Sequence, residues 1–360
     1  MKQTTITILC SGASLGVYVP GLVTNKQLRN KGLNTEIVVL ENLLFEEKKN
    51  NVHKSKLMFH QNFSFALMAQ KLAKDITPSL DPILVKNLLE KWQKEERKDF
   101  IVFSGFWLPI IDKYLSQIEF KDIRIDLCHM DAAISTSWKL YDTSNPRFRN
   151  IWFFRREEKK IFYNFPISHA EIIPYNQRNH RFLIHGGGCG VGTYKSKILD
   201  LEQQEIELDV IVYENKDLEH KTTKNRYFMI DPQWKAWDKD EIGNYQFPPL
   251  GWIKENAEIV FKNNESHPEV YNLIQHNKAI ISKPGGATLI DSLSAATPLI
   301  WLDPYGEYEE SNGLLWEELG FGIYYQKWVD SGYSLDLLEN LHNNIQKATV
   351  NLPNYFEIYN

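Results

Sequence analysis

The sequence predicts an α/β protein with two Rossmann-like halves that face each other across a cleft. An apolar run at residues 5–10 is followed by a glycine-containing loop and a helical stretch, and the same order restarts at 181–194. A third apolar run, 279–282, ends in Lys-Pro-Gly-Gly before another helix. Such strand–loop–helix units build open parallel sheets, which bind ligands beyond the carboxyl ends of their strands.

The first half, residues 1–174, is expected to form one domain. TITILC (5–10) indicates a buried strand, SGASLGVYVPGL a loop, VTNKQLRNKG a helix ended by Gly32, and EIVVL (36–40) the next strand. The polar stretch that follows, 41–98, is mainly helical in pattern. Further along the chain we expect strands at 100–105 and 124–133, an aromatic hairpin at 151–165 and a linker around Pro174.

The second half, residues 175–345, repeats the strand-and-helix order. RFLIH and ELDVIVYEN indicate strands on either side of the helical KSKILDLEQQ, and 216–250 indicates a polar insertion of loops or short hairpins. Ser266 and Glu269 have the spacing of a capping box, which predicts a helix start there. Residues 346–360 form a tail that we expect to cross back to the first domain.

Composition limits the classes of function. A net charge of −5 implies no bulk attraction to nucleic acid or anionic lipid. Cys10, Cys128 and Cys189 are odd in number and far apart, which argues against a disulfide framework and against a zinc site. Neither a signal peptide nor an apolar run of 18 residues is evident, so we expect a soluble, cytoplasmic protein.

The Lys-Pro-Gly-Gly-Ala-Thr junction at 283–288 has the features of an anion site. The first turn of a helix presents unpaired N–H groups and the positive end of the helix dipole. Glycine lacks the Cβ that would hold a phosphate away from those donors. A tight turn without a ligand explains the same residues equally well, so the junction alone does not distinguish an anion site from an ordinary turn.

Four motifs in order resemble GT-B glycosyltransferases, above all the bacterial family that adds N-acetylglucosamine to lipid I and related UDP-sugar glycosyltransferases. SKPGGATLIDSLSAATPLIWLDPYGEYEESNGLLWEELGFG is similar to the donor-binding segment of that family. SGASLGVYVPGL resembles its first glycine-rich loop, HMDA (129–132) its His-Glu-Gln-Asn stretch and HGGGCG (185–190) its second glycine loop. The resemblance implies the GT-B fold, with acceptor and donor domains on either side of a cleft.

Carried over residue by residue, the resemblance also implies roles. The donor diphosphate would be held by Gly186, Gly187, Gly188, Lys283, Gly285, Gly286, Ala287 and Thr288. Ribose would be bound by Asp291, the nucleobase by the loop around His267, and the donor sugar by Tyr308, Glu309 and Asn312. The acceptor-side loop would contain Gly12, Ser14, Gly16 and Val17. Gly188 and Glu309 replace a Ser and a Gln of the family, and solvent-exposed positions for Asp291 and Glu309 are the alternatives.

The catalytic base is the main departure from the family, because Val17 stands where relatives carry His or Asp. Asp131 or His129 can serve instead, from the end of a strand that faces the cleft. An acceptor that needs no strong base is a second interpretation, and a binding module without catalysis is a third.

The expected function is transfer of a sugar from a nucleotide-sugar, by family habit a UDP-sugar, to a small-molecule, peptide or lipid-linked acceptor. The resemblance implies an inverting reaction without metal or other cofactor, and DKD (238–240) is interpreted as surface charge. The alternatives are a sugar-nucleotide epimerase or hydrolase and a nucleotide-sugar binding protein. HKSKLMF (53–59) either touches lipid headgroups or forms an ordinary helix face.

Overall fold

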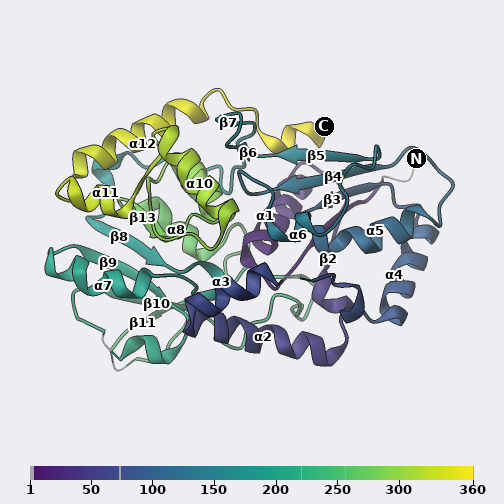
Figure 1. Ribbon diagram of the computed structural model, residues 1–360, viewed down its shortest axis with the longest axis horizontal. Coiled ribbons are helices and arrows are strands. Elements are labelled where there is room, and N and C mark those ends of the chain that lie inside the picture. Colours follow the sequence, from purple (N-terminus) through teal and green to yellow (C-terminus); the bar gives the residue numbers. More distant parts are fainter. Residues whose placement is uncertain (1–3, 73, 220, 256, 360) are drawn as a thin grey trace.

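Two α/β domains lie side by side in the computed structural model, which describes residues 4–72, 74–219, 221–255 and 257–359 (Figure 1). The first domain contains a parallel sheet in the order β2-β1-β3-β4-β5. Its strands are β1 (Ile6–Cys10), β2 (Thr35–Val39), β3 (Asp99–Val102), β4 (Arg124–His129) and β5 (Phe148–Trp152). Its helices are α1 (Leu15–Asn30), α2 (Glu46–Gln61), α3 (Phe63–Lys71), α4 (Pro82–Lys94), α5 (Leu108–Leu115) and α6 (Thr136–Lys139).

The second domain contains a larger sheet, in the order β12-β11-β10-β9-β8-β13-β14-β15, which is parallel except where β11 pairs with its two neighbours. Its strands are β8 (Arg181–His185), β9 (Glu207–Val212), β10 (Arg226–Ile230), β11 (Leu250–Ile253), β12 (Phe261–Lys262), β13 (Ile280–Ser282), β14 (Leu299–Trp301) and β15 (Gly322–Tyr324). Its helices are α7 (Tyr194–Gln203), α8 (Glu269–His276), α9 (Gly286–Ala295), α10 (Glu307–Glu318), α11 (Tyr325–Asp330) and α12 (Leu335–Thr349). The predicted α/β class with two parallel sheets is confirmed.

Helix α1 begins earlier than the sequence suggested. The prediction placed its start at residue 23, after a loop that contains Pro20, whereas the structure begins it at Leu15 with Ser14 as the N-cap. Pro20 cannot donate the usual backbone hydrogen bond inside a helix. Burial of Tyr18, Leu22 and Val23 offsets that loss, because these side chains pack into the core.

Two other local predictions differ from the structure. Helix α8 begins at Glu269 with Pro268 at its N-cap, and the Ser266 hydroxyl bonds to Asn264 instead of capping the helix. The expected hairpin at 151–165 is shorter, since β5 runs into the main sheet and only β6 (Phe154–Arg155) and β7 (Lys160–Ile161) form the hairpin. The polar insertion also contains a sheet strand, β10, followed by a segment that packs on the first domain.

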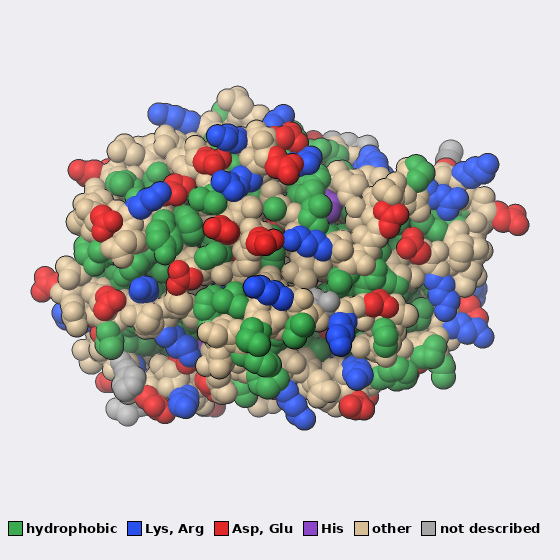
Figure 2. Space-filling model, viewed as in Figure 1, with side chains coloured by type: hydrophobic (Ala, Val, Ile, Leu, Met, Phe, Trp, Pro, Cys, Tyr) green, Lys and Arg blue, Asp and Glu red, His purple; other side chains and the backbone are tan. Residues whose placement is uncertain are grey.

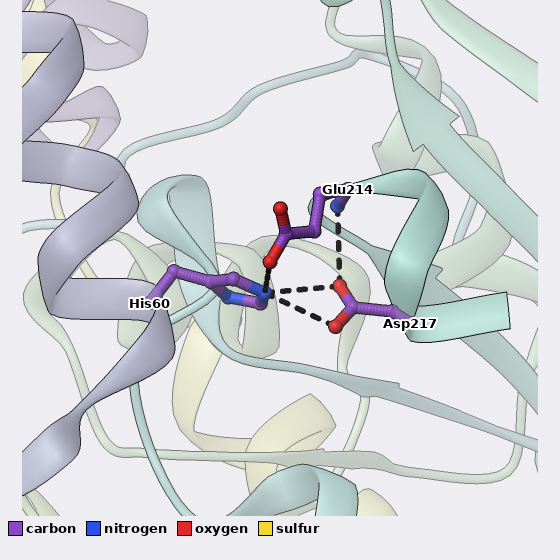
Figure 3. Close-up of side chains that lie close together, drawn as sticks. All are labelled: His60, Glu214 and Asp217. Atoms are coloured by element: carbon purple, nitrogen blue, oxygen red, sulfur yellow. Dashed lines mark hydrogen bonds and ion pairs between the residues drawn. The ribbon is translucent and has the colours of Figure 1, made fainter. Parts of the chain in front are cut away.

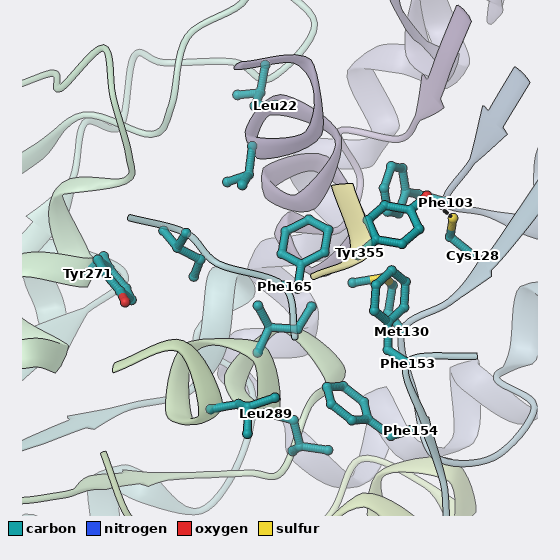
Figure 4. Packing of buried hydrophobic residues seen from close by; sticks show 14 of the residues in the cluster. Leu22, Phe103, Cys128, Met130, Phe153, Phe154, Phe165, Tyr271, Leu289 and Tyr355 are labelled. Carbon is teal, nitrogen blue, oxygen red and sulfur yellow. Dashed lines mark hydrogen bonds between the residues drawn. The ribbon is translucent and has the colours of Figure 1, made fainter. Parts of the chain in front are cut away.

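The C-terminal residues contact the first domain through aromatic rings. In the last turn, η7 (Tyr355–Tyr359), the ring of Tyr355 meets Phe153 edge-on at 4.8 Å and stacks on Phe165 at 5.8 Å (Figure 4). This approach is fixed by the backbone, because Asn164 N–H donates to Pro353 and Tyr355 N–H donates to Asn164, both at 2.9 Å. The chain therefore passes between the domains twice, at two adjoining segments.

Buried carboxylates tie each sheet together. Asp209 on β9 is fully buried; it accepts two bonds of 2.6 Å from Arg226, one of 3.0 Å from Arg181 and one of 2.9 Å from Asn277. Asp126 on β4 has a matching arrangement with Arg149 and the Tyr359 hydroxyl. Among the described helices, none has the length and hydropathy needed to cross a bilayer.

We predict that Asp209→Asn lowers the free energy of unfolding by about 2–4 kcal/mol, because two arginines lose the charge that they face inside the protein. Urea denaturation measures this change. The control is Asp122→Asn, which removes an exposed carboxylate 2.8 Å from Lys98 and should leave the transition midpoint in place. Equal midpoints for the two variants would contradict the prediction.

Candidate functional site

Asn312 joins the two domains at the carboxyl ends of their sheets. Its side chain is fully buried and accepts a 2.6 Å hydrogen bond from the N–H of Ala132, just beyond β4. Its amide nitrogen donates to the Asp131 carboxylate and to the Pro284 carbonyl, both at 2.8 Å. One α10 side chain thus holds the strand end of the first domain against the Gly-Gly junction of the second.

The first turn of α9 faces the first domain directly. No side chain caps this helix, whose N-cap is Gly285. A Cβ on Gly286 would overlap the carbonyl of Met130 and lie 2.9 Å from the Asp131 carboxylate. Glycine is therefore needed at 286 for the close approach of the β4 loop, in addition to any role in ligand access.

Lys283 lies between the two glycine loops of the second domain. Its ammonium pairs with Glu309, which is 3% exposed and also accepts a 2.7 Å bond from the Tyr305 N–H. A Cβ on Gly285 would lie 3.3 Å from the Lys283 nitrogen, and one on Gly187 would lie 3.6 Å from its Cε. The predicted residues after β8 and β13 are thus brought together around one cation.

The second glycine loop forms a 3₁₀ turn, η5 (Gly187–Cys189), after β8. Gly187 has φ +69°, a left-handed conformation that suits glycine, and its N–H donates to His185 Nδ1 at 2.9 Å. Burial, together with Lys283, lowers the pKa of His185 to about 4, so the ring is neutral and can accept this bond. A Cβ on Gly188 would come 2.5 Å from Leu15, which places the loop against the start of α1.

The N-terminal loop is held by Glu41, a residue that the sequence analysis missed. Its buried carboxylate accepts bonds from the Ser11 hydroxyl at 2.7 Å, from Gly12 N–H at 2.6 Å and from Ala13 N–H at 2.8 Å. Glu41 lies two residues beyond the end of β2, and the rule that polar groups gather at the carboxyl ends of strands could have found it. The protein's own carboxylate therefore occupies these amides.

The other residues expected on this loop belong largely to α1. Ser14 caps the helix by accepting from Gly16 N–H at 3.2 Å, and Gly16 and Val17 lie in the first turn. Val17 is half-buried and packs against the core cluster that spans both domains. Its side chain thus has a packing role that explains an apolar residue there.

Asp131 and His129 have different surroundings. Burial raises the pKa of Asp131 to about 6, although the hydrogen bond from Asn312 opposes that rise. His129 is 3% exposed, stacks on Trp152 at 4.2 Å and bonds through Nε2 to Asn150 at 2.8 Å. Burial lowers the pKa of His129 to about 4. Of the two, only Asp131 forms a hydrogen bond to the second domain among the described residues.

The remaining predicted residues are more dispersed. Asp291 is half-buried on α9; burial raises its pKa to about 7, and no described residue bonds to its carboxylate. Thr288 is 7% exposed in the same helix. The carboxylates of Glu309 and Asp131 add to burial in raising the pKa of the Tyr308 phenol, which places Tyr308 in their neighbourhood. His267 bonds to Ser266 and Asn272, both at 2.8 Å, beside α8.

A pocket of about 400 Å³ opens beside the Asp131–Asn312 contact. It crosses the domain boundary, since its walls come from the loop after β4, from the β5–β7 region and from α10. The lining residues are Ala132, Ala133, Ile134, Trp152, Arg155, Arg156, Glu157, Lys159, Ser311 and Glu318. Ala132 and Ser311 are the chain neighbours of Asp131 and Asn312, so the pocket adjoins the candidate base.

A second polar cluster joins α2 to the loops that follow β8 and β9 in the second domain (Figure 3). His60 Nε2 lies 3.0 Å from Asp217 and 3.7 Å from Glu214, and its Nδ1 lies 2.8 Å from the Gly190 carbonyl. The three side chains are spaced like metal ligands. The Lys195 ammonium, however, lies 2.8 Å from Asp217 and 3.0 Å from His60. A positive charge of the protein itself therefore pairs with the carboxylate of this cluster, where a metal ion would otherwise bind.

Comparison with known proteins gives a partial sequence match and matches in overall fold. No protein-family model matches the chain. A processive diacylglycerol beta-glucosyltransferase of Staphylococcus epidermidis is 28% identical over 99 residues. That match spans 27% of this chain and 24% of the relative.

Solved structures match over nearly the whole length. They include MurG of Acinetobacter baumannii, with a TM-score of 0.53, 10% identity and coverage of 99% of this chain and 98% of that one. The spinosyn rhamnosyltransferase SpnG (TM-score 0.55, 10% identity) and the glycosyltransferase VinC in complex with DTDP (TM-score 0.55, 9% identity) have the same coverage. The chain therefore has the two-domain GT-B fold of these glycosyltransferases.

Proposed function

We propose that the protein is a glycosyltransferase that moves a sugar from a nucleotide-sugar to an acceptor hydroxyl. The observation that carries this proposal is the meeting of Lys283, two glycine loops and Asp131 where the carboxyl ends of both sheets face each other. A diphosphate leaving group needs cations and N–H donors, and an attacking hydroxyl needs a base. The GT-B fold and the partial match to a glucosyltransferase support the same conclusion.

The donor diphosphate would bind Lys283 and the backbone N–H groups of the two glycine junctions. Phosphate would then compete with Glu309 for the lysine ammonium. A carboxylate as buried as Glu309 is costly when unpaired, so it would need new hydrogen-bond donors, and sugar hydroxyls supply them. Asp291, which lacks a described partner, would accept from ribose hydroxyls in the same way.

A nucleoside diphosphate is the class of donor nucleotide that these groups suit. One structural neighbour was solved with DTDP, and the sequence motifs resemble those of UDP-sugar enzymes. We propose that the donor is a UDP-sugar and that its uracil lies next to the loop around His267. Helix amides and Lys283 would neutralise the departing charge, so the reaction would need no metal.

Asp131 is proposed as the general base. Its carboxylate would take the proton of the acceptor hydroxyl as that oxygen attacks the anomeric carbon. The bond from that carbon to the diphosphate would break on the opposite face, so the configuration would invert. A pKa near 6 leaves most of the carboxylate ionised at neutral pH while making it a better base than an exposed Asp.

The acceptor would enter through the pocket beside Ala132 and Ser311. Its apolar residues and its arginines would suit a small molecule, a peptide or a lipid-linked sugar, and the partial relative acts on diacylglycerol. A cytoplasmic location would supply nucleotide-sugars. Nucleotide release that depends on acceptor indicates a transferase, release without acceptor a hydrolase, and tight binding without release a binding protein.

We predict that Lys283→Gln weakens UDP binding about 10- to 100-fold, because a charge-assisted bond to phosphate is lost. Isothermal titration calorimetry measures the affinity. The double variant with Glu309→Gln removes the buried carboxylate that the single change leaves unpaired, and it should bind UDP as weakly. Lys327→Gln, an exposed lysine paired with Glu317, is the control. Unchanged affinity in both Lys283 variants would place the diphosphate elsewhere.

We predict that Asp131→Asn lowers turnover by on the order of 10² while UDP affinity stays constant, because the amide keeps the shape and loses the basicity. Turnover of the unaltered protein should rise with pH through about 6 and level off above it, since the deprotonated carboxylate is the active form. This inflection should disappear in the variant. UDP release from UDP-glucose with diacylglycerol is the first assay to try. If the Asp131→Asn variant turned over within a few-fold of the unaltered protein, Asp131 would not be the general base.

We predict that EDTA leaves turnover intact, because Lys283 and the amides of α9 carry the leaving-group charge. The same UDP-release assay measures this. Activity that is lost in EDTA and restored by Mg²⁺ or Mn²⁺ would instead require a metal at the diphosphate.

A further inference from the structure

Helix α2 carries two side chains that contact different glycine-containing loops. The Lys56 ammonium donates a 2.8 Å hydrogen bond to the carbonyl of Gly12 in the N-terminal loop. One helical turn later, His60 Nδ1 lies 2.8 Å from the carbonyl of Gly190, at the end of the second glycine loop. Residues four positions apart project from the same side of a helix. One side of α2 therefore holds a loop of the first domain and a loop of the second.

The contact of His60 depends on the backbone of the second glycine loop. Gly190 has φ +60°, a left-handed conformation that glycine adopts without strain. A Cβ at this position would come 2.5 Å from His60 Nδ1. A carbonyl oxygen can only accept a hydrogen bond, so Nδ1 carries the hydrogen. Glycine at 190 thus provides both the turn and the space for the imidazole ring.

The rest of the His60 ring is surrounded by the second domain. Figure 2 shows hydrophobic and basic side chains over α2 and α3 on this face of the molecule, whereas the His60 side chain has no exposed surface. Its ring centroid lies 4.7 Å from that of Tyr213. With the hydrogen on Nδ1, the lone pair of Nε2 can accept from the Lys195 ammonium at 3.0 Å. A side chain of the first domain is therefore enclosed and hydrogen bonded at both ring nitrogens by the second.

The other contacts between the two loops are weakly directional. A Cβ on Gly188 would come 2.5 Å from Leu15, and the Cys189 thiol lies 3.8 Å from the Ala13 carbonyl. An apolar contact has no preferred angle, and a thiol is a weak donor. Hydrogen bonds from nitrogen to a carbonyl have narrow limits of distance and angle. The two bonds from α2 thus restrict the spacing of the loops more than these contacts do.

We propose that Lys56 and His60, which we call the α2 clamp, are positioning residues that set the spacing between the N-terminal loop and the second glycine loop. The inference rests on the proposed function, in which the second glycine loop binds the donor diphosphate and the N-terminal loop lies on the acceptor side. Neither side chain touches substrate in this scheme. The helix between them holds the N–H groups of the second glycine loop in place before the nucleotide binds, which lowers the entropy cost of binding.

Hydrogen–deuterium exchange of the protein without nucleotide tests the α2 clamp. His60→Ala should speed exchange of the amides in 186–191 by about tenfold or more, because the bonds that Gly190 and Val191 donate within this loop would open more often. Lys56→Met should speed exchange of the same amides, although Lys56 bonds to the other domain. His60→Asn should restore slow exchange, because its side-chain amide can donate to the carbonyl in place of Nδ1.

His342→Ala is the matched control for loss of a buried histidine. His342 is 1% exposed, and its Nδ1 lies 2.7 Å from the Ala296 carbonyl at the far end of α9. This variant loses the same kind of bond and should leave exchange in 186–191 unchanged.

Calorimetry with UDP adds a second measurement. His60→Ala and Lys56→Met should each weaken UDP binding by about 3- to 10-fold through the loss of one positioning bond. The double variant should bind no more weakly than the weaker single variant, because both residues act through one helix.

Three results would overturn the α2 clamp. The first is slow exchange in 186–191 in His60→Ala, or a Lys56→Met effect that stays within the N-terminal loop. The second is an equal rise in exchange in His342→Ala, which would trace the effect to general destabilisation. The third is a double variant whose two losses of UDP affinity multiply, since the loops would then be held independently. If the unaltered protein bound no UDP, the proposed function would fail, and the exchange measurement without nucleotide would still decide whether α2 holds the two loops.

Discussion

The buried amide of Asn312 is the interaction on which the arrangement of the two domains depends. One side chain satisfies the N–H of Ala132, the carbonyl of Pro284 and the carboxylate of Asp131, and these belong to two separate segments, the loop after β4 and the loop after β13. A buried amide that lost one of these partners would leave a polar group unpaired in the interior. The spacing between the β4 loop and the start of α9 is thus fixed by hydrogen bonding as well as by the missing side chain at Gly286.

The same region concentrates ionisable groups that ordinary packing would avoid. Lys283 and Glu309 form an ion pair with little access to water. Asp131 lies close enough for the charges of both residues to act on its pKa. Structural ion pairs can perturb a pKa without any catalytic role, but here Asp131, whose pKa is raised, adjoins a pocket and the Gly285–Gly286 junction. Burial, charge and access to substrate therefore coincide at one place in the fold.

Local sequence signals predicted the parts of the structure that depend on local physics. Apolar runs ending in glycine identified β8 and β13 and their loops. Buried strands require consecutive apolar residues, and turns that are left-handed or closely packed require glycine, so both can be recognised from the sequence. The start of α1 was missed, since Pro20 is a helix breaker locally and only tertiary burial of Tyr18 and its neighbours overrides it. Ser266 had cap spacing, yet Pro268 sets the start of α8. Glu41 and His60 were not predicted because their partners are distant in the chain.

The two passages of the chain between the domains have a mechanical consequence. Residues near Asn164 and Asn354 run parallel and are hydrogen bonded to each other, so the covalent connections lie together at one edge of the interface. Two adjacent tethers resist sliding and twisting far more than they resist rotation about the line through them. Any widening of the cleft would then follow a single hinge axis at that edge, and the greatest displacement would fall on the contacts of α2 and α3 with the second domain.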